Sequence, residues 1–560
     1  MRGYLTGFAG AAVAVALVFP AFAEPEVVVL GGPTDADPVV ACGDLAASPF
    51  EAGREGRGVS DEHMLINAAI AACEAAVAAD PDSASAGTWL ARAYLAAGRM
   101  DDARPLLEDA FNAGNPFAAY LLSDVVRLQG NPDETLNSLD LLISASEGGF
   151  APAQADLALM YETGRGMDAN AAEAMRLYEL ASAGGHGLAS YKVGEFYWRA
   201  FGVAFDAARA REAYALAAEQ GEPLGNTGLG QVAQYAETPD YEAAAGFYQL
   251  AADKREKIAE AELAYLYDQG LGVQQDLQKG FELLTDSSNQ GWPWAKAALS
   301  LYYLFGKAVP VDEAKAFELA GDALWPEAVG TGPAVPYAYG IIGYMYKEGL
   351  GTQRSLSQAF YNYQSGADRG DQFSNDQLAV VQTLLACSDA AAAPYETTPE
   401  VKVAFSDLDP SVAIPACEQA VATDPHVGNK AWLARAYVKA ERYDEAIPLL
   451  EEGLASGNRV ANFVLADLLM NGEGIEADPE RAFAMYQAMV QDDFGIAQLE
   501  IGKAYAKGRG VDQDLDEALR WFKLAQANGI EDAAAQIEAL GLEPVADVDL
   551  SGFGREGPGY

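Results

Sequence analysis

The stretch Ala497–Gly529 reads AQLEIGKAYAKGRGVDQDLDEALRWFKLAQANG and carries the pattern on which the fold prediction depends. Its opening alanine, Ile501 and Tyr505 recur at spacings of four, which places their side chains on one face of a helix. A glycine-rich turn follows at residues 508–511. Asp514 then precedes a second apolar pattern that ends at the final glycine. The stretch therefore predicts two antiparallel helices joined by a tight turn.

The same template recurs along the chain, repeatedly at a spacing of 36 residues, and a degenerate copy lies between about residues 225 and 256. The recognisable copies start at Ala153, Ala189, Ala259, Ala295, Ala338, Ala461 and Ala497. Their turn glycines are Gly164, Gly166, Gly202, Gly270, Gly272, Gly349, Gly351, Gly472, Gly474, Gly508 and Gly510. Because one such hairpin cannot bury its apolar face alone, neighbouring hairpins must stack. We predict an all-α fold, an α-solenoid of stacked antiparallel helical hairpins.

Each repeated residue type has a physical role in this prediction. The turn glycines supply positive φ at the end of the first helix, where a side chain would be strained. The grooves between neighbouring hairpins are predicted to be filled by aromatic side chains, including those of Tyr161, Tyr197, Tyr505 and Trp521. Ala308 replaces one turn glycine in the copy that starts at Ala295, so we expect a different turn there.

These repeats resemble the Sel1-like repeat family, a relative of the tetratricopeptide repeats, and residues 497–529 match it best. They have the family's alanine, glycine, tyrosine, Gly-x-Gly-Val, aspartate and aromatic-pair positions. They depart from it at Ile501, Glu517 and Gln526, where leucine, lysine and alanine are usual. The resemblance implies a helical solenoid. It also implies roles such as adaptor, assembly factor or regulator in envelope signalling and exopolysaccharide systems.

A longer segment of the chain also occurs twice. Trp89-Leu-Ala-Arg-Ala-Tyr94 reappears at residues 432–437, and Pro105-Leu-Leu-Glu108 reappears at residues 448–451, both at an offset of 343. The Trp…Arg-Ala-Tyr helix followed by an acidic helix resembles a tetratricopeptide-type hairpin. Each copy of this module leads into 36-residue repeats.

The four cysteines fall at equivalent places in the two modules, Cys42 and Cys73 in the first, Cys387 and Cys417 in the second. An even cysteine count in an exported protein suggests disulfides, and four cysteines allow three pairings. The duplication selects one of these, Cys42–Cys73 together with Cys387–Cys417.

The N-terminus has the features of a signal peptide. Arg2 precedes an apolar run from Tyr4 to Phe19, and the small residues Ala21 and Ala23 fit a cleavage site. The run is shorter than the roughly 20 residues of a membrane-spanning helix. No cysteine follows the cleavage site, so no lipid anchor is indicated. We expect a Sec-exported, non-lipoprotein chain that is periplasmic or secreted and does not insert into the membrane after cleavage.

These patterns divide the chain into seven segments. They are a signal peptide (1–23), a linker (24–40), a disulfide-containing module (41–148), repeats (149–385), a second disulfide-containing module (386–458), repeats with a C-terminal cap (459–542) and a flexible tail (543–560).

The charge of the chain narrows the class of partner. The 82 acidic and 36 basic residues give a formal net charge of −46. Such a chain repels nucleic-acid phosphate, so we predict no nucleic-acid partner. The acidity is spread over the whole chain, which fits either a solvated surface or a basic partner.

The sequence offers no candidate for chemistry. The three histidines, His63, His186 and His426, do not lie at metal-ligand spacing, and neither a P-loop nor a nucleophile elbow is present. We predict no enzyme activity, catalytic residue, metal or cofactor.

The leading hypothesis is a scaffold that binds a protein or peptide of the cell envelope. The alternative is a peptidoglycan- or polysaccharide-binding protein. The sequence leaves two roles open for three tryptophans, which either pack between hairpins or stack on a ligand. They are Trp292, Trp294 and Trp325.

Overall fold

The computed structural model describes residues 37–51, 53–54, 58–129, 137–324, 335–394, 402–490 and 494–541. The predicted signal peptide, most of the predicted linker, the predicted tail and Trp325 lie outside the described residues. Within these ranges every regular element is a helix, which confirms the predicted all-α fold. The chain forms two compact units, and the boundary between them falls within α16 (Pro293–Phe305), between Ala295 and Lys296.

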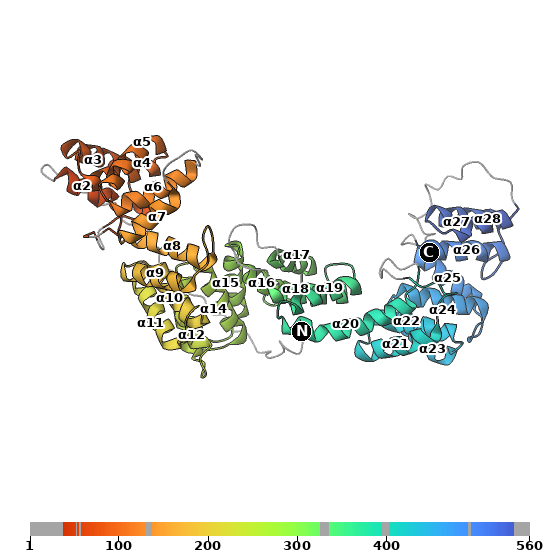
Figure 1. The fold of residues 1–560 in the computed structure, drawn as a ribbon. Helices are drawn as coiled ribbons and strands as arrows, with labels where there is room; N and C mark the ends of the chain where they lie inside the picture. Colours follow the sequence, from red (N-terminus) through yellow and green to blue (C-terminus); the bar gives the residue numbers. More distant parts are fainter. Residues whose placement is uncertain are drawn as a thin grey trace, which may run out of the picture. The chain divides into compact units, whose positions relative to one another are not determined.

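The first unit stacks its helices in chain order (Figure 1). Its helices are α2 (Pro38–Ala46), the 3₁₀ turn η1 (Asp61–His63), α3 (Ile66–Ala79), α4 (Ala84–Ala96), α5 (Met100–Asn112), α6 (Pro116–Gln129), α7 (Ser138–Glu147), α8 (Ala151–Thr163), α9 (Ala171–Ala183), α10 (Gly187–Arg199), α11 (Ala207–Glu219), α12 (Pro223–Gln234), α13 (Tyr241–Ala252), α14 (Lys257–Gln269) and α15 (Leu277–Asn289).

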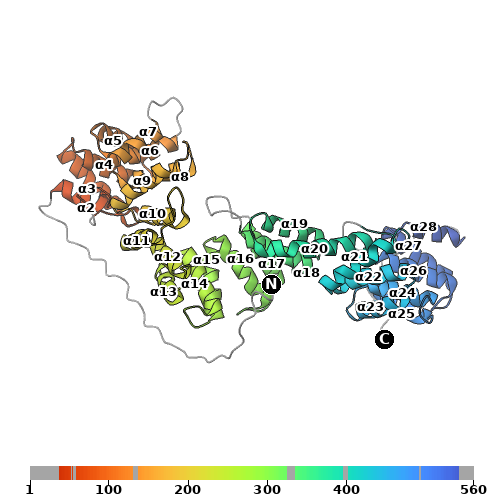
Figure 2. The ribbon, with the colours of Figure 1, turned by 60° about the horizontal axis from the view of Figure 1, so that its bottom comes forward.

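The second unit repeats the same arrangement of helical hairpins (Figure 2). Its helices are α17 (Glu313–Leu324), α18 (Pro336–Glu348), α19 (Leu356–Ala367), α20 (Gln372–Ala391), α21 (Pro410–Thr423), α22 (Val427–Lys439), α23 (Tyr443–Ala455), α24 (Arg459–Asn471), α25 (Pro479–Met489), α26 (Gly495–Lys507), α27 (Leu515–Ala527) and α28 (Asp532–Ala539).

Two predicted segment boundaries fall inside helices. The last residues of the predicted linker belong to α2, which Asp37 caps by accepting a hydrogen bond from the Val39 amide. The predicted start of the second module at residue 386 lies within α20, a continuous helix of 20 residues. Cys387 therefore lies on the helix that follows and packs against the hairpin of α18 and α19.

Several hairpins are held together by an aromatic ring of the second helix. The rings of Tyr214, Tyr363 and Phe522 are fully buried. A Cβ atom added at Gly194 would lie 2.5 Å from the Tyr214 ring, and one at Gly502 would lie 2.5 Å from the Phe522 ring. The small residue of the first helix therefore provides the space that the aromatic ring of the second helix fills.

The second helix of a hairpin begins after a capping residue, such as Asp514 before α27 and Asn170 before α9. The Asp514 carboxylate accepts hydrogen bonds from the amides of Asp516 and Glu517, both 3.0 Å long. The Asp514 amide in turn donates to the Tyr505 carbonyl at 3.0 Å. Asn170 and Tyr161 make the same backbone bond at 2.9 Å in an earlier repeat. This bond fixes the turn between the two helices.

The turn glycines adopt the left-handed conformation that the sequence predicts, with φ of 63° at Gly508 and 73° at Gly510. Ala308 has a φ of 58° and keeps the same conformation. The expectation of a different turn at Ala308 is therefore wrong. The left-handed region costs an alanine about 1–2 kcal/mol, which the packing of the surrounding repeats offsets.

Candidate interaction groove

The first duplicated module is built around a buried arginine. Arg92, on α4, donates hydrogen bonds to the carbonyl oxygens of Ala46 at 3.0 Å and Val59 at 2.9 Å, and its Nε donates to the Asp61 carboxylate. The disulfide Cys42–Cys73 joins α2 to α3 beside this loop. The guanidinium thus satisfies loop carbonyls that would otherwise be buried without a donor.

The second module repeats this construction. Arg435, on α22, donates to the carbonyl oxygens of Ala391 at 2.8 Å and Val403 at 2.6 Å. The disulfide Cys387–Cys417 joins α20 to α21. The structure therefore contains both cysteine pairs that the duplication selects, and no described cysteine is free.

The two modules differ at one residue next to the arginine. Because Val59 and Val403 occupy the same place in the bonding pattern, Asp61 of the first module corresponds to Phe405 of the second. Asp61 forms an ion pair with Arg92. Phe405 instead presents its ring to Arg435, at 5.8 Å from the guanidinium carbon, and remains 45% exposed. The second module thus places an exposed aromatic ring where the first has a carboxylate.

A groove of about 770 Å³ lies beside Phe405, within the second unit. We call it the C-terminal groove. The first helices of successive hairpins, α22, α24 and α26, line it together with the start of α28 and the loop that carries Phe405. Its apolar lining residues are Pro394, Ala404, Phe405, Val438, Phe463, Val464, Leu468, Ile496, Leu499 and Ile530. Clefts of this size that combine apolar walls with a few polar groups are the usual form of a binding site.

The charged residues of the C-terminal groove are mainly acidic. They are Asp467, Glu473, Glu500, Glu531 and Asp532, against Arg435 and Lys503. Arg435 is committed to the loop carbonyls, and the Lys503 ammonium lies 2.7 Å from the Glu500 carboxylate. Glu473, Glu531 and Asp532 form no ion pair with any residue of the described ranges. The groove therefore carries unbalanced negative charge.

Asp467, on α24, is a half-buried member of this acidic lining. Burial, together with the charge of Glu500, raises the pKa of Asp467 to about 6. The Tyr486 hydroxyl donates a hydrogen bond to it at 3.2 Å, which partly opposes this rise. A smaller recess of about 290 Å³ shares Asp467, Glu500 and Lys503 with the groove and is also lined by Lys507 and Arg509. The C-terminal groove is thus acidic near α28, and the adjoining recess is basic near the end of α26.

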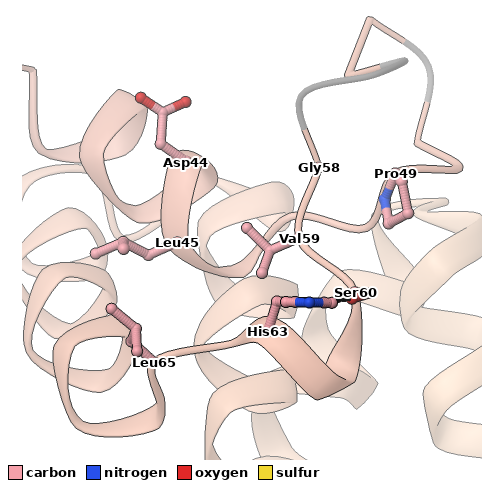
Figure 3. Close-up of a pocket in the computed structure, with 8 residues that line it drawn as sticks. All are labelled: Asp44, Leu45, Pro49, Gly58, Val59, Ser60, His63 and Leu65. Atoms are coloured by element: carbon pink, nitrogen blue, oxygen red, sulfur yellow. Dashed lines mark hydrogen bonds between the residues drawn. The ribbon is translucent and has the colours of Figure 1, made fainter. Parts of the chain in front are cut away.

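A separate pocket lies in the first module, beside η1 (Figure 3). The Ser60 hydroxyl and His63 Nδ1 are hydrogen-bonded at 2.7 Å. Asp44 also lines this pocket, but its carboxylate points away from His63 in Figure 3 and pairs with Arg54 at 3.0 Å. Because Ser60 and His63 are both exposed and belong to one short turn, their hydrogen bond closes that turn rather than completing a catalytic triad.

The aromatic residues singled out in the sequence have mixed surroundings. Tyr161, Tyr197, Tyr505 and Trp521 are half-buried, whereas Tyr214, Tyr248, Tyr363, Tyr486 and Phe522 of the second helices are fully buried. Trp292 is half-buried with the Lys257 ammonium 5.7 Å from its ring, and Trp294 is 44% exposed. Neither tryptophan lines the C-terminal groove. Sequence reasoning missed Phe405 and Ile530, because both lie outside the repeated template.

Among the described residues, no group of three or more histidine, cysteine or carboxylate side chains is arranged to hold a metal ion. Among the same residues, no helix has the length and apolar composition that crossing a bilayer requires.

Comparison with protein families agrees with this architecture. A model of the Sel1 repeat matches the chain eight times, and a model of the tetratricopeptide repeat matches residues 66–125. The Sel1 matches cover residues 151–186, 187–222, 226–255, 257–292, 295–320, 336–371, 459–491 and 495–529. The chain belongs to the Sel1-repeat family. Sel1 and tetratricopeptide repeats are in general protein-interaction scaffolds, because stacked hairpins present extended surfaces.

Two solved structures similar to this chain are described as having an SLR fold or a Sel1 repeat. A protective antigen of uropathogenic Escherichia coli with an SLR fold is 23% identical, with a TM-score of 0.43, over 78% of this chain and 93% of the antigen. A Sel1 repeat protein from Oxalobacter formigenes is 24% identical, with a TM-score of 0.40, over 44% of this chain and 99% of that protein. No protein in the curated set matches the chain.

Proposed function

We propose that this Sel1-repeat protein is an exported scaffold that binds a partner protein or peptide of the cell envelope and catalyses no reaction itself. The C-terminal groove is the observation that carries the proposal. It combines about 770 Å³ of space with apolar walls from successive hairpins and unpaired carboxylates. These features suit a side chain of another protein, because apolar contacts supply affinity and the charged groups supply specificity.

Two features support the exported location. All four cysteines of the two disulfides are fully buried. Structural disulfides form and persist in oxidising compartments. The N-terminal sequence fits a signal peptide, with the apolar run from Tyr4 to Phe19 before Ala21 and Ala23. A periplasmic or secreted chain would meet both conditions.

Affinity capture tests the proposal. The chain, with its disulfides intact, is immobilised and exposed to native envelope extract, and the retained material is identified by mass spectrometry. The expected result is one protein that is enriched over a control column carrying the chain reduced and alkylated at its four cysteines. Retention of peptidoglycan or polysaccharide without any protein would overturn the proposal in favour of glycan binding.

A further inference from the structure

We propose that the C-terminal groove binds a segment of a partner protein in which an aromatic or large aliphatic side chain adjoins a lysine or arginine. This inference rests on the proposed scaffold function and names the chemistry of its partner. The apolar walls would take the large side chain, and the carboxylates of Glu531 and Asp532 would take the adjoining cation.

The first module shows which kind of side chain suits this place. There Phe50 follows Pro49 in the loop, and its ring lies 5.4 Å from the His186 ring at the start of α10. His186 and Ile530 follow the glycine that ends the second helix of the preceding hairpin, Gly185 and Gly529 respectively. Each donates its amide to the second helix in the same way, His186 to Ala181 and Ile530 to Ala525. The first module therefore rests an aromatic ring on the residue that corresponds to Ile530.

In the second module the equivalent place lies along the C-terminal groove. Pro394 corresponds to Pro49, and both Pro394 and Ile530 line the C-terminal groove. Phe405, the replacement for Asp61, adds a half-exposed ring to the same wall. An aromatic side chain from a partner would occupy here the position that Phe50 occupies in the first module. Such rings prefer tilted or edge-on contacts like that between Phe50 and His186, whose planes meet at 32°.

Charge selects a basic neighbour for that ring. Glu531 and Asp532 stand exposed beside Ile530, and neither forms an ion pair with a described residue. Glu531 makes no side-chain capping bond to α28, so its carboxylate is not committed to the helix end. The net charge of −46 further attracts a basic segment and repels an acidic one. Lys507 and Arg509 lie in the adjoining recess, which confines this preference for a cation to the α28 side.

Fluorescence anisotropy with the full-length chain tests the inference. The probe is a fluorescein-labelled peptide of two lysines followed by two phenylalanines. Two comparison peptides replace either the lysines by glutamates or the phenylalanines by serines. We expect saturable binding of the first probe and binding at least about tenfold weaker for both comparison peptides, because ring and cation each contribute.

Matched variants separate the groove from general charge attraction. Glu531→Lys and Phe405→Ala should each weaken binding of the lysine–phenylalanine probe about tenfold. Glu538→Lys makes the same charge change on the exposed surface of α28, outside the groove, and should change binding less than about twofold. Equal losses for Glu531→Lys and Glu538→Lys would overturn the inference, as would the absence of saturable binding.

One further variant tests whether the chain fills its own groove. Tyr395 follows Pro394 as Phe50 follows Pro49, and it lies outside the described residues. A Tyr395→Ala chain that binds the probe at least about tenfold more tightly would show competition by this ring and overturn the partner assignment.

If the captured envelope protein is retained equally by wild type, Glu531→Lys and Phe405→Ala, the scaffold function stands and the assignment of this groove fails.

Discussion

At the scale of single residues, Gly508 and Gly510 occupy one turn for different physical reasons. A Cβ atom at Gly508 would lie 3.2 Å from the Gln513 Cβ, a tight contact with a side chain that adds to the cost of the positive φ. A Cβ atom at Gly510 would lie 2.0 Å from the Pro479 carbonyl oxygen, at the start of α25 in the preceding hairpin. The second glycine therefore also sets how closely adjacent hairpins stack.

This difference predicts the cost of two otherwise equivalent substitutions. Gly508→Ala should lower the free energy of unfolding by about 1–2 kcal/mol, the cost of a left-handed alanine. Gly510→Ala should lower it by at least about 3 kcal/mol, because the backbone of the preceding hairpin must also shift. Urea denaturation of both variants measures these values. Equal losses would show that hairpin stacking does not depend on Gly510.

A second single-residue effect concerns a buried carboxyl group in the first unit. Glu260 on α14 is 3% exposed and accepts a hydrogen bond from Gln290 at 2.7 Å. Burial, followed by the charge of Asp286, raises the pKa of Glu260 to about 7. The folded state therefore holds this proton at pH values where the unfolded chain, with a pKa near 4.5, has lost it.

The raised pKa predicts a loss of stability as the pH increases. Between about pH 4.5 and 7 the folded state binds more protons than the unfolded state, so the free energy of unfolding falls through this window. Glu260→Gln should remove up to about 3 kcal/mol of that fall, whereas Glu242→Gln on the exposed surface of α13 should leave it unchanged. Urea denaturation at pH 5 and pH 8 measures the difference. A Glu260→Gln chain with the wild-type pH dependence would contradict this assignment.

At the scale of elements, the duplicated modules combine a disulfide with a buried arginine. Arg92 and Arg435 each donate hydrogen bonds to two carbonyl oxygens that flank the loop of their module. The bridges span 31 and 30 residues. Closing loops of this length limits the freedom of the unfolded chain, while the arginine fixes the loop in the folded one. In the second module, this combination fixes the loop whose Phe405 lines the C-terminal groove.

Removing a bridge should destabilise its module. The double variant Cys387→Ser/Cys417→Ser should lower the free energy of unfolding of the second module by about 3–4 kcal/mol, because the unfolded chain regains loop entropy. Hydrogen exchange of the α20–α23 amides measures this loss. The matched variant Cys42→Ser/Cys73→Ser should leave these amides unchanged. Equal exchange in the wild type and the Cys387→Ser/Cys417→Ser chain would contradict the role of the bridge.

At the scale of the whole molecule, the sequence predicts the fold better than the groove. The spacing of four, together with the glycine turns, predicts the hairpins because local helix geometry and turn strain depend on nearby residues. The duplication predicts the cysteine pairs because equivalent residues of two copies of one module make equivalent bonds. The groove instead depends on residues distant in the chain, such as Phe405, Val464 and Ile530, which only the stacking of hairpins brings together.

The hydrogen-exchange footprint of a captured partner on the intact chain tests the scaffold account most directly. The account predicts that the bound partner slows amide exchange in α22, α24, α26 and the start of α28, whose residues line the C-terminal groove. It also predicts that Phe405→Ala weakens this protection. Protection confined to the first unit, or a retained partner that protects no helix of either unit, would contradict the account.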